Sequence, residues 1–169
     1  MKIAGIVAAI VVALVLQTTL ARFVVRGTFA LDLVLVAVVY VALSDGPVAG
    51  LLSGAAAGLA QDALSSGFLG IGGLAKTVVG FLVGTIGSHL IITQPVPRFV
   101  AFAAATIVHA AVLIALYVLL DLRQFGSPYA AIAGQALGNA VVGVLSFQLA
   151  ELLPGAVERR RAQKARIRR

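Results

Sequence analysis

The stretch DGPVAGLLSGAAAGLAQDALSSGFLGIGG, residues 45–73, decides the fold. Its Asp-Gly-Pro opening at 45–47 predicts a turn followed by a helix, because proline fits the first turn of a helix, where its missing N–H loses no hydrogen bond. Gly50, Gly54 and Gly58 then recur at every fourth position. At helical pitch they form one stripe without side chains, which another backbone can approach closely. That neighbour could belong to the same chain, to another copy or to another protein.

The composition is that of a membrane protein. Of the 169 residues, 61% are hydrophobic and 11% are charged, and the mean hydropathy is +1.09. Soluble domains average about 45–50% apolar and roughly 25% charged residues. The chain has no cysteine, which excludes disulfides and thiol-bound metals. The length fits one compact domain.

The apolar segments predict an all-α bundle of six transmembrane helices. The Val-rich second segment would suggest a strand in water, but a lone strand in lipid cannot satisfy its backbone. A proline-bracketed connection at 93–98 precedes the fifth segment, and Pro154-Gly155 is expected to end the sixth. We expect a transmembrane domain over residues 1–157, with spans at about 3–20, 28–43, 47–64, 74–92, 99–120 and 129–153.

The positive charge is concentrated in a basic tail at residues 158–169. Six spans place both termini on one side of the membrane, and the excess of Lys and Arg there predicts a cytoplasmic side. The tail acts either as a topology anchor or as a docking surface for anionic lipid or a cytoplasmic partner. Nucleic acid is not an expected partner of a chain that is mostly embedded in lipid. The basic residues of the tail are Arg159, Arg160, Arg161, Lys164, Arg166, Arg168 and Arg169.

Asp62 is the ionisable residue that stands out, because a carboxylate within a membrane span is costly unless it is paired or reached by water. The simplest interpretation is that Asp62 accepts hydrogen bonds from the backbone of residues 65–67 and shapes the following loop, with Gln61 in the same local network. A contact with a partner or ligand, and a role in moving a proton or ion, are the alternatives. The loop at 65–73 is apolar enough to enter the bilayer interface.

No set of residues in the sequence predicts catalysis or metal binding. His89 and His109 lie on different predicted helices without a carboxylate or cysteine cluster, so we expect no metal site and no cofactor. The serines lack a histidine and an acid at a convincing spacing. Gln135 and Asn139, in the sixth segment, are expected to hydrogen-bond between helices. We therefore expect a protein that is not an enzyme.

Four pieces of the central stretch resemble the signature region of the rod-shape-determining MreD family: residues 43–50, Gly54, residues 58–62 (GLAQD) and residues 67–70 (GFLG). In that family a small-residue helix follows a glycine-proline turn, ends in a Gly-Leu-x-x-Asp segment and leads into a short loop that closes near Leu-Gly. The resemblance marks the following positions as partner-binding or helix-packing residues: Gly50, Gly54, Gly58, Gln61, Asp62, Gly67 and Gly70.

The resemblance implies a non-enzymatic scaffold in the bacterial inner membrane that serves cell elongation, rod shape and peptidoglycan synthesis. Such a scaffold would bind an MreC-like bitopic protein through small-residue helix faces. Through that protein it would connect to the MreB filament and to RodA with its class B transpeptidase. A homodimer is a further option.

The family is also similar in fold to the S-components of energy-coupling-factor transporters. This similarity supplies the alternative function, a membrane subunit that binds a small molecule. In that case four side chains would line a cavity: Gln61, Asp62, Gln135 and Asn139.

Overall fold

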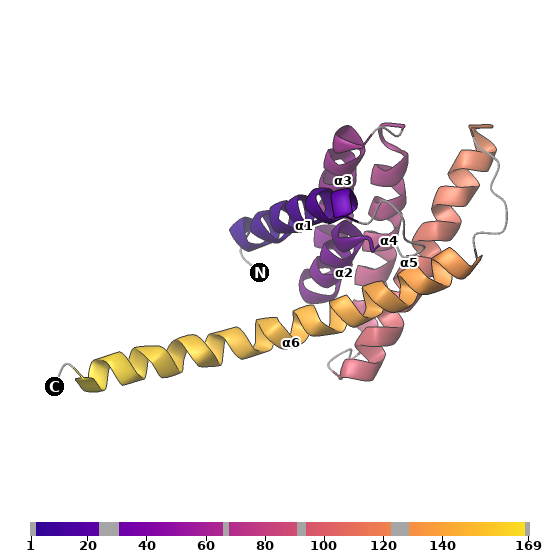
Figure 1. Ribbon diagram of the computed structural model, residues 1–169. Coiled ribbons are helices and arrows are strands. Elements are labelled where there is room, and N and C mark those ends of the chain that lie inside the picture. The colour runs from indigo at the N-terminus through magenta and orange to yellow at the C-terminus, as the bar shows by residue number, and fades with distance from the viewer. Residues whose placement is uncertain (1–2, 24–30, 66–67, 91–93, 123–128, 168–169) are drawn as a thin grey trace.

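The computed structural model describes residues 3–23, 31–65, 68–90, 94–122 and 129–167, and of residues 20–23 and 153–167 it describes only the course of the helix. Within these ranges the protein is all-helical (Figure 1). The helices are α1 (Ile3–Phe23), α2 (Leu33–Asp45), α3 (Pro47–Leu64), α4 (Ile71–His89), α5 (Pro95–Leu119) and α6 (Tyr129–Ile167).

An antiparallel pair, α3 and α4, makes the most extensive helix contact in the described part of the chain. Helix α2 packs against both of them, and α1 covers the outer side of α2 and α3. Helix α5 lies between α4 and α6. Helix α6 crosses α2 and α5 obliquely, and its C-terminal part extends away from the other helices (Figure 1).

The predicted Asp-Gly-Pro turn separates α2 from α3. Gly46 has a φ of 88°, a value that favours glycine because it has no Cβ. Its N–H donates to the carbonyl of Ala42 at 3.0 Å and so closes α2. Pro47 is the first residue of α3, where proline's fixed φ suits a helix start.

The glycine stripe of α3 brings two backbones together, as its spacing predicts, and the neighbour is α4 of the same chain. A Cβ on any of the three glycines would collide with the backbone of α4. The contacts pair Gly50 with Gly80, Gly54 with Lys76, and Gly58 with Gly73. Close packing between small residues is a principal source of helix association in lipid, where burial of apolar surface contributes little.

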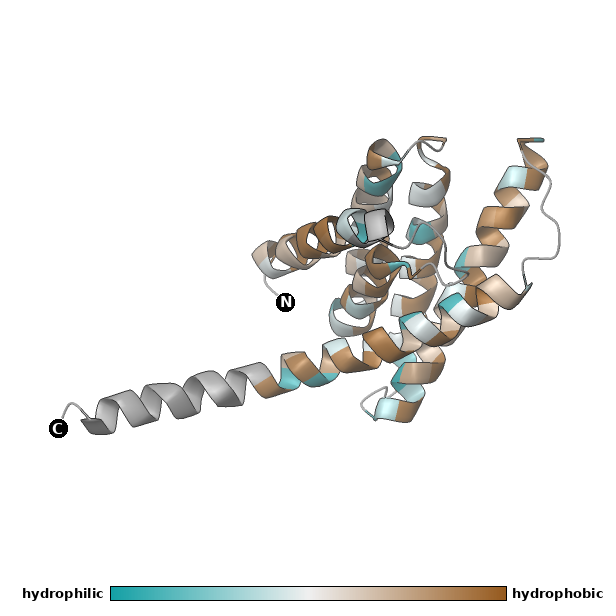
Figure 2. Cartoon of the chain, in the orientation of Figure 1, coloured by the Kyte–Doolittle hydropathy of each residue, from teal (hydrophilic) through white to brown (hydrophobic). Residues whose placement is uncertain are grey.

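Three described helices are long and apolar enough to cross a membrane: α4, α5 and residues 129–152 of α6. Figure 2 shows hydrophobic residues along most of the bundle. The described apolar part of α1 (Ile3–Thr19) and all of α2 (Leu33–Asp45) are shorter. Helix α2, with 13 residues, is about 20 Å long, whereas the hydrocarbon core is about 30 Å thick. The expectation of six spans is therefore supported for three helices.

Several helices begin or end at other residues than the expected spans do. Helix α4 begins at Ile71, whereas the expected fourth span begins at 74. Helix α5 begins at Pro95 and not at 99, because the first turn of a helix has N–H groups without intrahelical partners and tolerates proline. Helix α6 does not end at Pro154-Gly155 but continues to Ile167. The segment that follows the proline is rich in Arg, Ala, Gln and Lys, which favour a helix. The start of the expected second span, at 28–30, lies outside the described residues.

The close contact between α3 and α4 predicts that Gly54→Leu destabilises the bundle strongly. The new side chain would have to displace the backbone of Lys76, and overpacking of a tight interior costs about 1–3 kcal/mol or more. Ala56→Leu is the matched control, since Ala56 lies on the exposed side of α3. We expect a lower yield of monodisperse protein and a lower melting temperature in detergent for Gly54→Leu alone. Equal stability of the two variants would contradict the packing account.

Candidate functional site

The centre of the bundle contains charged side chains that are almost fully removed from solvent. Asp32 precedes α2, Lys76 lies on α4 and His109 lies on α5, with exposed fractions of 6%, 3% and 3%. Ionisable groups inside a membrane protein are expensive and are retained where they are paired, so they mark a candidate site. We call Asp32, Lys76, Thr106, His109 and Asn139 the polar cluster.

Lys76 joins the two other ionisable groups of the polar cluster. Its Nζ lies 2.8 Å from Asp32 Oδ2 and 3.3 Å from His109 Nε2. An ammonium group only donates hydrogen bonds, so Nε2 is the acceptor and the proton of a neutral imidazole lies on Nδ1. The other carboxylate oxygen of Asp32 accepts from the N–H of Leu35 at 2.9 Å. One carboxylate thus neutralises the buried lysine and caps α2.

Asn139 and Thr106 extend the polar cluster to α6 and α5. Asn139 Oδ1 accepts from the N–H of Asp32 at 3.0 Å, and Asn139 Nδ2 donates to Thr106 Oγ1 at 3.2 Å. Thr106 Oγ1 donates in turn to the carbonyl of Phe102 at 2.9 Å. The predicted interhelical hydrogen bonding of Asn139 is confirmed. The polar cluster therefore connects α2, α4, α5 and α6.

Gln17 of α1 completes the hydrogen bonding at the start of α2. Its amide nitrogen donates to the carbonyl of Leu31, and its amide oxygen accepts from the N–H of Leu33, both at 2.8 Å. The first N–H groups of a helix lack intrahelical partners. Here side chains of three elements satisfy three of these N–H groups. Helix α2 can therefore begin beside the middle of α5, where His109 lies, and beside the middle of the membrane-length part of α6, where Asn139 lies. Irregular backbone is tolerated at such a depth where protein satisfies it.

Asp62 forms a separate contact at the end of α3. Its Oδ2 accepts from the N–H of Gly70 at 2.9 Å and from the N–H of Gly73 at 3.0 Å. A carboxylate is favourable at this position because the N-terminal end of a helix carries a partial positive charge. Asp62 therefore shapes the loop and caps α4, although its side chain bonds Gly70 and Gly73 instead of the expected residues 65–67, of which 66 and 67 lie outside the described part.

The remaining predicted site residues do not converge on one place. Gln61 Oε1 is buried without a hydrogen-bond partner among the described atoms, and Gly67 lies outside the described residues. Helices α3 and α6 do not pack against each other where the structure describes them. The alternative function requires a cavity between α3 and α6, and the helix arrangement does not support it. The four side chains that would line this cavity are Gln61, Asp62, Gln135 and Asn139.

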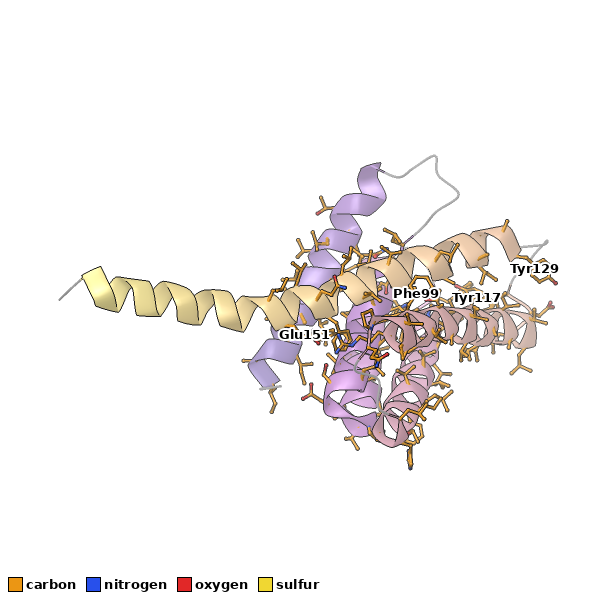
Figure 3. The ribbon with its side chains drawn as sticks, turned by 90° about the horizontal axis from the view of Figure 1, so that it is seen from below. Phe99, Tyr117, Tyr129 and Glu151 are labelled. Carbon is orange, nitrogen blue, oxygen red and sulfur yellow. The ribbon has the colours of Figure 1, made fainter. Side chains whose placement is uncertain are left out.

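A second charged contact holds α6 against the N-terminal end of α5. Arg98 Nη2 lies 2.6 Å from Glu151 Oε1, and the Arg98 guanidinium carbon lies 4.4 Å from the centre of the Phe147 ring. Arg98 is 7% exposed. Figure 3 shows Glu151 where α6 begins to extend beyond the bundle, and Tyr129 at the opposite end of the membrane-length part of α6.

An apolar groove of about 630 Å³ runs between α4 and α5. Its α4 wall includes bulky side chains, whereas its α5 wall is rich in alanine. The α4 side chains include Leu82, Val83 and Ile86, and the α5 side chains include Ala101, Ala104 and Val108. The small side chains of α5 leave room for a helix to approach closely.

The glycine contact, the polar cluster and the three membrane-length helices define an all-helical membrane protein. A family model described as rod shape-determining protein MreD matches residues 2–153. The chain therefore belongs to the MreD family, whose members are shape-determining structural proteins, and the predicted resemblance is confirmed. No curated protein and no solved structure matches the chain. The similarity to S-components stays a prediction.

The polar cluster predicts strong energetic coupling between Asp32 and Lys76. Lys76→Met leaves the buried carboxylate of Asp32 without its cation. Removing one partner of a buried ion pair costs about 3–5 kcal/mol, so we expect a loss of stability of that size. The double variant Asp32→Asn/Lys76→Met removes both charges, so its loss should be clearly smaller than the sum of the two single losses. Reversible unfolding in detergent measures the cycle. Simple additivity would show that the two side chains do not act as a pair.

Proposed function

We propose that this protein is a non-enzymatic scaffold of the bacterial cell-elongation machinery, placed in the cytoplasmic membrane with both termini on the cytoplasmic side. Its direct partner is an MreC-like bitopic protein. Through that partner it connects the MreB filament with RodA and the class B transpeptidase that build peptidoglycan. Membership of a rod shape-determining family and the three membrane-length helices support this proposal.

We infer that the partner docks in the groove between α4 and α5, and the presence of this groove is the observation that carries the proposal. The glycine stripe of α3 is in contact with α4, so a partner could reach it only by separating these helices. The groove instead offers the wall formed by Ala101, Ala104 and Val108 beside the bulkier wall of α4. Packing, lipid release and weak interhelical contacts then drive binding in the bilayer.

A side chain that fills the groove should weaken the complex. Ala104 is exposed and lines the groove, so Ala104→Leu should leave the core intact while it blocks close approach of a helix. Ala56→Leu introduces the same side chain at an exposed position of α3, a helix that does not line the groove. We expect at least a tenfold loss of affinity for the MreC-like protein with Ala104→Leu, and near wild-type binding with Ala56→Leu.

The measurement is co-expression with the MreC-like protein of the same genome, solubilisation in mild detergent, and complex mass by size exclusion with light scattering. A stable complex of defined stoichiometry supports the scaffold, and its mass also gives the number of copies of this chain. Equal binding by the two alanine variants would move the docking site to another face. A well-folded protein that does not associate at all would contradict the proposed function.

A further inference from the structure

Helix α6 is longer than a membrane requires. With 39 residues it is about 58 Å long, whereas the hydrocarbon core is about 30 Å thick. Its membrane-length apolar part ends at Leu152, and the helix continues as residues 153–167, which we call the basic arm. Figures 1 and 3 both show the basic arm leaving the bundle sideways, beyond the other helices.

The charge of the protein is concentrated on this arm and on the two residues that follow it. Residues 158–169 contain seven of the thirteen Lys and Arg residues and one of the six Asp and Glu residues, so they carry +6 of the net charge of +7. At 3.6 residues per turn, positions 159, 160, 161, 164 and 166 cover more than half of the helix circumference. Among residues 158–167, the other side carries Glu158, Ala162 and Ala165.

This pattern differs from that of an interfacial amphipathic helix, which needs a broad apolar face. Ile167 is the only large apolar residue after Val157. The attraction that such an arm offers is therefore electrostatic. We propose that the basic arm binds the headgroups of anionic phospholipids and holds α6 at a fixed tilt in the membrane.

The position of the arm favours a lipid surface over an acidic protein. Arg159 is seven residues beyond Leu152, about 10 Å along the helix, which is close to the screening length of about 8 Å at physiological salt. Helix α6 crosses α5 obliquely (Figure 1), so the two helices cannot both stand upright in a membrane. On a tilted α6 the positions beyond Arg159 stay closer to the membrane surface than they would on an upright helix.

The part of α6 that precedes the basic arm is held against the bundle. Glu151, one residue before the end of the apolar part, lies 2.6 Å from Arg98 of α5, and Asn139 hydrogen-bonds to the start of α2. Because the arm and the span are one helix, a force on the arm acts on the packing of α6 against α5 and α2. Lipid composition would thus influence the geometry of the bundle.

The chain has no cysteine, so one introduced cysteine can report the position of the arm. The full-length Gln163→Cys variant is labelled with a fluorophore and placed in nanodiscs that contain a lipid with a quencher on its headgroup. We expect several-fold stronger quenching with phosphatidylglycerol in the nanodisc than with phosphatidylcholine alone, and we expect raised salt to reverse it. Arg159→Gln/Arg160→Gln/Arg161→Gln should abolish most of the difference.

The matched control, Arg22→Gln/Arg26→Gln/Arg123→Gln, removes three cations elsewhere in the chain and should keep the difference. Equally strong quenching in both lipids would show that the tilt of α6 alone brings the basic arm to the headgroups, without attraction to anionic lipid. That result would overturn the proposal. Weak quenching in both lipids would place the arm away from the headgroups, as binding to an acidic protein requires, and would overturn it too. The assay contains no MreC-like protein, so its result is independent of the proposed scaffold function.

Discussion

Helix α2 begins inside the bundle, and the rest of the structure depends on how its first backbone groups are satisfied. A buried N–H without a partner costs about 1–3 kcal/mol, and no water of the bilayer core can supply that partner. Gln17 of α1, Asn139 of α6 and the carboxylate of Asp32 meet this need. The carboxylate then requires a cation, which Lys76 of α4 provides. The hydrogen bonding of one short helix thus fixes the positions of three others.

The glycine contact between α3 and α4 also helps to hold Lys76 in its position beside Asp32. Gly54 lies against the carbonyl of Lys76, so the turn of α4 that carries the buried lysine is also one of the turns that approach the backbone of α3 closely. Asp62 caps the start of α4 only a few residues earlier. Position and orientation of α4 are therefore fixed by backbone contact on one side and by the ion pair on another. The remaining side of α4 faces the groove in which we propose that a partner docks.

The sequence predicts contacts between residues that are close along the chain better than contacts between residues that are far apart along it. The glycine stripe and a loop-shaping role of Asp62 are predictable because spacing and local chemistry determine them, whereas the cap that Asp62 provides to α4 depends on how the loop folds. The polar cluster is not predictable in this way, since Asp32, Lys76, His109 and Asn139 lie on four separate segments and only the fold brings them together. The sequence does indicate that Asp32 and Lys76 could pair, because each is a single charged residue inside an apolar segment. The continuation of α6 past Pro154 departs from the expected helix end, because good helix formers follow the proline.

Hydrogen exchange at the start of α2 is the most direct measurement of the central claim. In nanodiscs, the N–H groups of Asp32, Leu33 and Leu35 should exchange as slowly as those in the middle of α4, because side chains from three elements hold them. Asn139→Ala should accelerate exchange at Asp32 first. Fast exchange of these amides in the wild-type protein would show that water reaches the start of α2, and would contradict the account of a sealed polar cluster.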